Sequence, residues 1–338
     1  MKNNKEKKTS SQGLLLIIIL IVIAAIVAVA AVYISTQDKK EPKSSPVDSK
    51  QANTEDTLNS GYITYQGEKY EYNANLKTML FLGIDKEEET TVREVTGRSG
   101  QSDCIILAVF DQEKQTTTLL EISRDSMVDI DIYGMDGTYL DTQTAQIALQ
   151  YAYGQGEKQS CQLTRDAVSE FLYGIRIDDY LSLNMAGIPP IVDSIGGVEI
   201  TVPKDYTAVD PAFVQGATLT LNGEQAKTYV RKRDTTVLGS NNDRMERQTQ
   251  FIQALFAKVQ ASEDNGSNML LQFWSSGEPY MTTDMDFNTL NKMTSYTMEP
   301  EILKVPGEVR AGAEHDEFYV DEAGLQQMII DTFYQKVE

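Results

Sequence analysis

Three runs of apolar residues predict the strands of a buried sheet. They are MLFLGID at residues 79–85, CIILAVFD at 104–111 and TTTLLEIS at 116–123. Their near-continuous apolarity is typical of strands that are covered on both faces. Only residues 112–115 separate the second run from the third, and this spacing predicts a β-hairpin.

Helical patterns follow these strands. Residues 142–153 (TQTAQIALQYAY) precede Gly154, and residues 163–173 precede Gly174. A glycine just after a helical pattern is typical of a helix C-terminus. Both segments are therefore predicted to be helices.

The alternation continues in the second half of the chain. Residues 187–197 (GIPPIVDSIGG) predict a short helix with prolines near its start, and residues 197–202 predict a strand. Asn222 is a candidate N-cap for the next helix, and a long helix is predicted over residues 243–260. The inward face of that long helix carries Ile252, Leu255, Phe256 and Val259. Strands that alternate with helices predict an α/β layered fold.

A long uncharged segment precedes this region. Residues 14–34 carry no charge, and at about 1.5 Å per residue a helix of this length crosses the roughly 30 Å hydrocarbon core of a bilayer. The run is longer than the apolar part of a cleaved signal peptide, about 7–15 residues, so we expect an uncleaved anchor. Four lysines before it outnumber a single glutamate, which predicts a cytoplasmic N-terminus.

These patterns divide the chain into four parts. The segment after the anchor is polar, contains prolines and lacks aromatic residues, as is typical of a flexible linker. The parts are a cytoplasmic tail at 1–13, a transmembrane anchor at 14–34, a linker at 35–61 and a domain at 62–338 that is expected to lie outside the cell membrane.

Composition and charge exclude several classes of function. The chain has 338 residues, with 30 Lys and Arg against 50 Asp and Glu, so its formal net charge is −20 and generic nucleic-acid binding is not expected. Two cysteines cannot form a disulfide-dense scaffold or a four-thiolate zinc site, and pairing of Cys104 with Cys161 is left open. The single histidine, His315, argues against Ser–His–Asp catalysis and multi-histidine metal sites.

Basic residues nevertheless gather in one stretch, VRKRDTTVLGSNNDRMERQ at residues 230–248. If its first basic residues are extended, Arg231 and Arg233 share one side. Guanidinium groups are well suited to phosphate, and a nearby helix N-terminus adds backbone N–H donors. The stretch is therefore a candidate anion site.

The helical part of this stretch has its own pattern. Arg244, Arg247 and Gln248 are spaced i, i+3 and i+4, so they line one face of a helix near its N-terminus. Cations are mildly unfavourable there, which also points to an anionic partner. The alternative is a solvated charged face in which Asp234 and Glu246 are the partners.

Two aspartates flank the predicted strands. Asp85 ends the first strand and Asp103 precedes the second. Mg²⁺ commonly takes one or two carboxylates together with phosphate, so the pair is a candidate metal site. The alternative is that both side chains cap turns. Arg124 ends the third strand, where Asp125 beside it is placed to orient the guanidinium.

Together these stretches resemble a known family. The matching segments are GID at 83–85, GQSD at 100–103, SRDSMVDI at 123–130, GGVEITV, LNGEQA…YVRKR and DRMERQ. Their order and spacing are similar to those of the LytR–CpsA–Psr (LCP) family over a motif core at 76–262, which leaves 263–338 as a C-terminal extension. The resemblance implies an α/β fold, a three-layer α/β/α sandwich with a mixed central sheet.

The resemblance also implies a function. It implies a cleft that holds a polyprenyl-pyrophosphate glycan donor and transfer of an anionic glycan, of the teichoic acid or capsule type, to peptidoglycan. A phosphodiester forms and polyprenyl phosphate is released. The apolar residues of the helices predicted at 142–153 and 163–173 are candidates either for lining the lipid channel or for the ordinary core.

Individual residues carry over from the family motifs. Asp85 and Asp103 match aspartates associated with Mg²⁺ (or Mn²⁺), which is expected to bind with the substrate pyrophosphate. The residues expected to bind pyrophosphate are Gln101, Arg124, Arg231, Arg233, Arg244, Arg247 and Gln248. Those expected to act in catalysis are Asp85, Asp103, Arg124, Arg231 and Arg233.

Two departures from the family pattern keep alternatives open. Gln101 stands where many members have arginine, and Ser123 stands where they have proline. A non-catalytic binder or sensor of wall glycan or lipid-linked intermediates is one alternative, and a polyprenyl-pyrophosphate hydrolase is another. In the transfer reaction the base is expected to be Asp85 or Asp103, or no base is needed.

Overall fold

The computed structural model describes the chain from Tyr62 to Val337 with short gaps. The described residues are 62–90, 96–97, 100–233, 238–263, 268–313 and 315–337. The predicted tail, anchor and linker at 1–13, 14–34 and 35–61 lie outside them. Within the described ranges, no helix combines the length and apolarity needed to cross a membrane.

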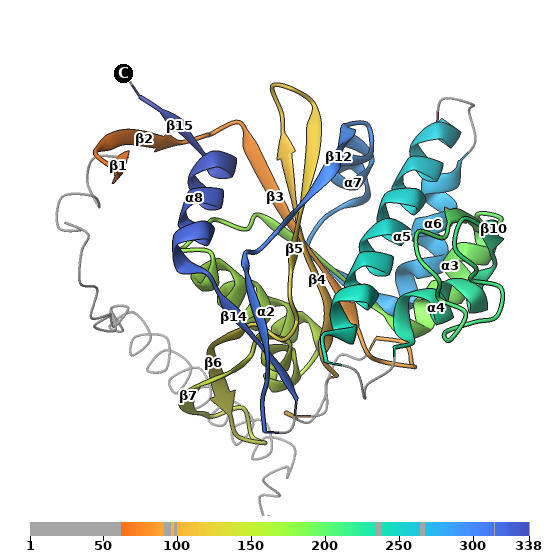
Figure 1. Ribbon diagram of the computed structural model, residues 1–338, viewed down its shortest axis with the longest axis horizontal. Helices are drawn as coiled ribbons and strands as arrows, with labels where there is room; N and C mark the ends of the chain where they lie inside the picture. The colour runs from red at the N-terminus through yellow and green to blue at the C-terminus, as the bar shows by residue number, and fades with distance from the viewer. Residues whose placement is uncertain are drawn as a thin grey trace, which may run out of the picture. The chain divides into compact units, whose positions relative to one another are not determined.

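A six-stranded mixed sheet forms the centre of the domain (Figure 1). In spatial order its strands are β11 (Met281–Thr283), β8 (Asp179–Asn184), β3 (Leu76–Ile84), β4 (Ser102–Asp111), β5 (Thr116–Ile122) and β12 (Thr297–Lys304). β3, β4 and β5 are the three predicted strands and pair antiparallel in turn, whereas β8 and β12 run parallel to β3 and β5. The predicted strands and the mixed central sheet are confirmed.

Helices cover both faces of this sheet (Figure 1). They are α2 (Glu157–Phe171) and α8 (Glu322–Phe333) on one face, and α5 (Ser240–Glu263), α6 (Met269–Gly277) and α7 (Phe287–Thr294) on the other. Every residue of β4 is buried, and its apolar side chains alternate between two separate clusters. This double covering explains the near-continuous apolarity of the strands. The helix predicted at 163–173 is α2, which begins earlier, and the long helix predicted at 243–260 is α5.

A smaller group of elements packs against α5. It consists of α3 (Ile188–Ser194), β9 (Val198–Thr201), β10 (Thr218–Leu221) and α4 (Gly223–Arg231), with the short 3-10 helix η2 (Met185–Gly187) before it. Asn222 caps α4, because its side chain accepts a hydrogen bond from the backbone N–H of Gln225 at 2.9 Å and the Gln225 side chain accepts one from the backbone N–H of Asn222 at 3.1 Å. The predicted cap, short helix and strand are confirmed.

The helix predicted at 142–153 is wrong in its first part. Residues 142–153 belong to β7 (Tyr139–Gln146) and the 3-10 helix η1 (Ile147–Tyr153), and the strand β6 (Met127–Tyr133) precedes them. β6 and β7 form an antiparallel hairpin, in which the Thr144 hydroxyl donates to Asp129 at 2.7 Å. Cross-strand pairs of this kind stabilise a ribbon and outweigh the helical pattern.

The segment after residue 263 is an integral part of the domain. It supplies β11 and β12 to the central sheet and helices α6, α7 and α8 to its two faces. Its remaining elements, and those that begin the described chain, are η3 (Glu278–Tyr280), β13 (Gly307–Ala311), β14 (Asp316–Val320), β15 (Tyr334–Lys336), β1 (Tyr62–Tyr65) and β2 (Glu68–Tyr72). β15 pairs with β2, so the first and last described strands share one small sheet.

Candidate functional site

The predicted site residues meet at one edge of the central sheet. Because β3 and β4 are antiparallel, the end of β3 lies beside the start of β4, and the backbone N–H of Asp85 donates to the carbonyl of Gln101 at 3.1 Å. β5 is antiparallel to β4, so Arg124 reaches the same edge. The first turns of α5 bring Arg244 to it from the second half of the chain.

Asp103 lies at the centre of this arrangement. Its Oδ1 accepts a hydrogen bond from Nη1 of Arg124 at 2.5 Å, and its Oδ2 accepts one from Nη1 of Arg244 at 2.8 Å. The Arg244 and Asp103 side chains are only 5% and 11% exposed, so their ion pair is shielded from water. Nη2 of Arg124 donates to Oε1 of Gln101 at 2.6 Å. Gln101 therefore orients Arg124 and adds no positive charge.

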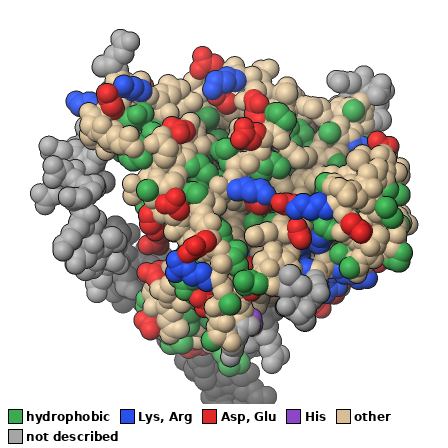
Figure 2. All heavy atoms as spheres, in the orientation of Figure 1, with side chains coloured by type: hydrophobic (Ala, Val, Ile, Leu, Met, Phe, Trp, Pro, Cys, Tyr) green, Lys and Arg blue, Asp and Glu red, His purple; other side chains and the backbone are tan. Residues whose placement is uncertain are grey.

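The solvated-face alternative is wrong for the helical part of the basic stretch. Arg244, Arg247 and Gln248 are all buried. Glu246 pairs instead with Lys204 at 2.6 Å, and Asp234 lies outside the described residues. On the face of the molecule that Figure 2 shows, basic and acidic side chains are interspersed. Glu246 thus pairs at the surface with a lysine, whereas Arg244 and Arg247 of α5 are buried.

The sequence predicts that Arg231 and Arg233 share one side if both lie in an extended segment. The structure shows that they do not lie in one extended segment. Arg231 is the last residue of α4 and forms an ion pair with Glu87 on the loop after β3. Lys232 ends the helix in an extended conformation, and Arg233 follows, half-buried. Arg233 has no ion-pair partner among the described residues. It lies near Asp125, whose pKa is raised by burial against the opposing charges of nearby arginines, Arg233 among them.

Arg247 holds the end of α4 in place. Its Nε donates to the carbonyl of Tyr229 at 2.7 Å, its Nη2 donates to the carbonyl of Lys232, and its guanidinium lies 4.7 Å from the centroid of the Tyr206 ring. Gln248 also donates to the α4 backbone, at 3.1 Å, and its Oε1 is buried without a hydrogen-bond partner in the described part of the chain. These contacts fix the segment that carries Arg231 and Arg233.

Asp85 is the exposed carboxylate of the site. Desolvation and the neighbouring Asp103 carboxylate raise the pKa of Asp85, against the opposing charges of nearby arginines. The described residues contain no group of three or more His, Cys, Asp or Glu side chains that could hold a metal ion. Two adjacent carboxylates do fit Mg²⁺, which keeps most of its waters and binds with phosphate. Because both oxygens of Asp103 already accept from arginines, Asp85 is the more available ligand.

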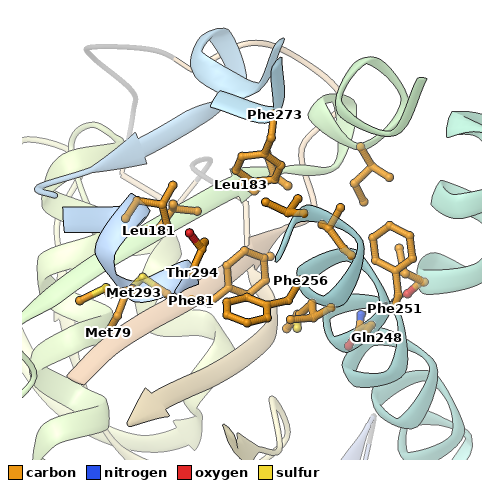
Figure 3. Close-up of a pocket in the computed structure, with 18 of the residues that line it drawn as sticks. Met79, Phe81, Leu181, Leu183, Gln248, Phe251, Phe256, Phe273, Met293 and Thr294 are labelled. Carbon is orange, nitrogen blue, oxygen red and sulfur yellow. Dashed lines mark hydrogen bonds between the residues drawn. The ribbon is translucent and has the colours of Figure 1, made fainter. Parts of the chain in front are cut away.

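An apolar cavity of about 180 Å³ lies between the sheet and helices α5, α6 and α7 (Figure 3). Side chains from β3, β8 and all three helices face one another across it. Among them are Phe81, Leu183, Phe256, Phe273 and Met293. Asp103 and Gln248 also line the cavity. The apolar space therefore reaches the cluster of arginines.

The segments at 142–153 and 163–173, which were candidates for a lipid channel or for the core, lie away from this cavity. Ile147, Tyr151, Cys161 and Val168 belong to the core on the opposite face of the sheet, so the core alternative is confirmed for η1 and α2. Cys104 lines the cavity, which separates it from Cys161, and both cysteines are free. The cavity depends on α6 and α7, which lie in the part of the chain that the motif resemblance did not cover.

Two residues of the site were not singled out from the sequence. Nζ of Lys86, next to Asp85, forms an ion pair with Oε1 of Glu157 at 2.7 Å, and the two side chains are 5% and 1% exposed. Asn241 accepts hydrogen bonds from Arg244. A single lysine or asparagine in a polar stretch does not by its residue type indicate a functional site. The only local clues were adjacency to Asp85 and the i, i+3 spacing from Arg244.

Known proteins share sequence and fold with this chain. The model of the LytR_cpsA_psr family matches residues 28–330, well beyond the motif core at 76–262. The polyisoprenyl-teichoic acid–peptidoglycan teichoic acid transferase TagU of Enterococcus faecalis is 30% identical over 241 residues, which cover 70% of this chain and 72% of that protein. TagV of Bacillus subtilis, a transferase of the same description, is 28% identical over 55% of this chain and 44% of its own length. The chain thus spans less than half of TagV.

Solved structures share the fold. TagT bound to LI-WTA superposes with a TM-score of 0.56 at 22% identity, covering 77% of this chain and 90% of that one. Protein gbs0355 from Streptococcus agalactiae gives a TM-score of 0.58 at 21% identity, covering 76% and 88%. With the family model matching most of its length, the chain belongs to the LytR–CpsA–Psr family.

Proposed function

We propose that this protein transfers a polyprenyl-pyrophosphate-linked anionic glycan to peptidoglycan. The observation that carries the proposal is that the apolar cavity and the cluster of arginines meet at Asp103. This residue lines the cavity and accepts hydrogen bonds from two arginines. A ligand that fills both has a hydrocarbon chain joined to a strongly anionic head. A polyprenyl pyrophosphate has this chemistry.

The relatives support the identity of donor and acceptor. TagU and TagV are named as transferases of polyisoprenyl-linked teichoic acid to peptidoglycan. We extend this class of donor and acceptor to the present chain, with a glycan of the teichoic acid or capsule type.

In the proposed reaction, a hydroxyl of the acceptor attacks the phosphorus nearest the glycan. A bond forms between the acceptor oxygen and this phosphorus, the bond from phosphorus to the bridging oxygen breaks, and polyprenyl phosphate leaves. Charge-assisted hydrogen bonds to the pyrophosphate stabilise the charge that develops on its oxygens. Their donors are Arg124, Arg231, Arg233, Arg244 and Gln248, while Arg247 positions the α4 end and Gln101 orients Arg124.

Asp85 is a better candidate than Asp103 for the base that takes the acceptor proton. Guanidinium groups hold both oxygens of Asp103. Asp85 is exposed, and no side chain of the described residues donates a hydrogen bond to its carboxylate. Its raised pKa also brings its proton affinity closer to what a base near neutral pH requires.

We further propose that Mg²⁺ or Mn²⁺ binds at Asp85 and Asp103 together with the pyrophosphate. A bound divalent cation would offset the negative charge of the substrate. The proximity of the two carboxylates, which adds to the effect of desolvation in raising the pKa of Asp85, supports this assignment. Asp103→Asn is expected to abolish metal-dependent transfer.

The anchor predicted at 14–34 completes the proposal, because the substrates named above lie outside the cytoplasm. A reporter fused after Glu338 should be active only on the extracellular side of the membrane. Activity of that reporter in the cytoplasm would remove wall chemistry from consideration.

Incubation of the full-length protein in detergent with Mg²⁺, a polyprenyl-pyrophosphoryl oligosaccharide and peptidoglycan fragments tests the proposal. We expect the oligosaccharide to appear on peptidoglycan through a phosphodiester. Release of the oligosaccharide phosphate to water would indicate the hydrolase instead. Tight binding of the donor without either product would indicate the non-catalytic binder, the alternative raised by Gln101.

A further inference from the structure

Asn241 occupies a buried position between two charged side chains of the site. It is the second residue of α5 and is 2% exposed. Its Oδ1 accepts from Nη2 of Arg244 at 2.7 Å and from Nε at 3.2 Å. Its Nδ2 donates to Oδ2 of Asp125 at 2.7 Å. The side chain therefore bridges an arginine and an aspartate that do not contact each other.

The chemistry of the neighbours fixes the direction of this bridge. A guanidinium can only donate, and an ionised carboxylate can only accept. The amide oxygen of Asn241 must therefore face Arg244, and its NH₂ group must face Asp125. An aspartate at this position would place two carboxylates against each other. An alanine would remove the bond that each partner makes to residue 241, leaving Arg244 its bond to Asp103 and Asp125 its bond from Gln146.

Asn241 also closes a ring of five side chains. Asp103 bonds to Arg124 and Arg244, and Nε of Arg124 lies 3.4 Å from Oδ1 of Asp125. Asn241 joins Asp125 to Arg244 on the other side. The ring contains two arginines, two aspartates and one neutral residue, so its formal charges cancel. A third carboxylate would give it a net negative charge beside the anion site.

We propose that Asn241 is a positioning residue that holds Arg244 at the pyrophosphate site through a neutral bridge. The proposal rests on the proposed function, since it assumes that Arg244 faces a pyrophosphate. It goes further in assigning a role to a residue outside the family motifs quoted above. It also states why that residue is an amide: the bridge must both donate and accept without adding charge.

Asn241→Asp tests this requirement, because protonation can restore the bridge. A protonated carboxyl donates through its O–H and accepts through its carbonyl, as the amide does. Adjacent buried carboxylates titrate together, and one of them keeps its proton to a raised pH. Position 241 contacts Asp125 and Arg244, and the charged groups that act on these two partners are Asp103, Arg124, Arg233 and Asp316.

The measurement is the affinity of the full-length protein in detergent for farnesyl pyrophosphate at pH 5 and pH 8. Asn242→Asp is the matched control, because Asn242 is the exposed neighbour and the substitution adds the same charge to the same helix turn. We expect Asn241→Asp to bind like the control at pH 5 and about tenfold more weakly at pH 8. Taking the ratio to the control at each pH removes the ionisation of the ligand itself.

The outcomes distinguish the positioning role of Asn241 from the proposed transfer reaction. Equal affinities of Asn241→Asp and Asn242→Asp at both pH values would overturn the positioning role. Wild-type protein that binds farnesyl pyrophosphate but transfers nothing would overturn the proposed reaction alone, and wild-type protein that does not bind it would overturn both. If circular dichroism shows that Asn241→Asp unfolds at pH 8, Asn241→Ala replaces it. Asn241→Ala should lose about tenfold in affinity at both pH values relative to Asn242→Ala, and equal affinity would again overturn the role.

Discussion

Arg244 donates a hydrogen bond to Asp103 at 2.8 Å across 141 residues of sequence. The pair joins the start of α5 to the start of β4, and both side chains are largely buried. One ion pair thus connects the helix that carries the basic stretch to the strand that carries the acidic residue of the site. Its removal should affect both the fold and the binding of an anion.

Arg244→Ala should lower the free energy of unfolding by about 3 kcal/mol, because removing one partner of a buried ion pair leaves the other charge poorly compensated. Arg124 still pairs with Asp103, which limits the loss. Lys204→Ala is the control, since Lys204 is half exposed and its ion pairs should contribute less than about 1 kcal/mol. Urea unfolding measures both variants. Equal small losses would show that the Arg244 pair is not buried in solution.

The pairing of Arg244 with Asp103 could be predicted only in part from the local sequence. The i, i+3, i+4 spacing correctly placed Arg244, Arg247 and Gln248 on one helix face. The helix dipole indicated that Arg244 needs an anionic partner, and the structure shows Asp103 as one within the protein. Neither argument could identify Asp103, because the antiparallel pairing of β3, β4 and β5 brings it there from a distant part of the chain.

The same limit explains the two fold-level differences. The central strands were predictable because burial on both faces leaves a continuous apolar run. The β6–β7 hairpin was not, because β7 is exposed and its stability depends on cross-strand pairs such as Thr144 with Asp129. For a related reason the segments at 142–153 and 163–173 were candidates for both a lipid channel and the core: apolar periodicity identifies a buried face but not the face of the sheet that it meets.

The pH dependence of transfer should reflect Asp85. A base acts in its ionised form, so transfer should fall as the pH drops through the pKa of Asp85. This acid limb should lie above the range of an ordinary aspartate, because desolvation and Asp103 raise the pKa. Arg231 lowers that pKa, so Arg231→Ala should move the acid limb of kcat to higher pH. A wild-type profile equal to that of Asp85→Asn would remove Asp85 from proton transfer.

Filling the cavity should weaken binding of the hydrocarbon part of the ligand and leave binding of the anionic part unchanged. Leu183→Trp places a larger side chain among the cavity residues shown in Figure 3. We expect at least a tenfold loss of affinity for farnesyl pyrophosphate and no change for inorganic pyrophosphate, because only the first has a hydrocarbon chain. Leu140→Trp, on the exposed strand β7, should change neither. Equal losses for both ligands would mean that the cavity does not hold the lipid.

Both cysteines should be free thiols that react slowly in the folded protein. Cys104 and Cys161 are buried in separate clusters on opposite faces of the sheet. Burial raises the pKa of Cys161 to about 12 and also raises the pKa of Cys104, which keeps both thiols protonated at pH 8. Mass spectrometry after alkylation in denaturant without reductant should show both modified. Modification only after reduction would reveal a disulfide.

Arg233 is the most direct test of the arginines that are proposed to bind the anion. It is half-buried and lacks an ion-pair partner within the described ranges, so replacing it should disturb the fold least. Isothermal titration of farnesyl pyrophosphate into the full-length protein should show wild-type binding and a loss of roughly ten- to hundredfold in Arg233→Ala, since one charge-assisted hydrogen bond is removed. Arg233→Lys should recover little of it, because an ammonium cannot bind bidentately. Equal affinities of wild type and Arg233→Ala would show that these arginines do not bind the pyrophosphate.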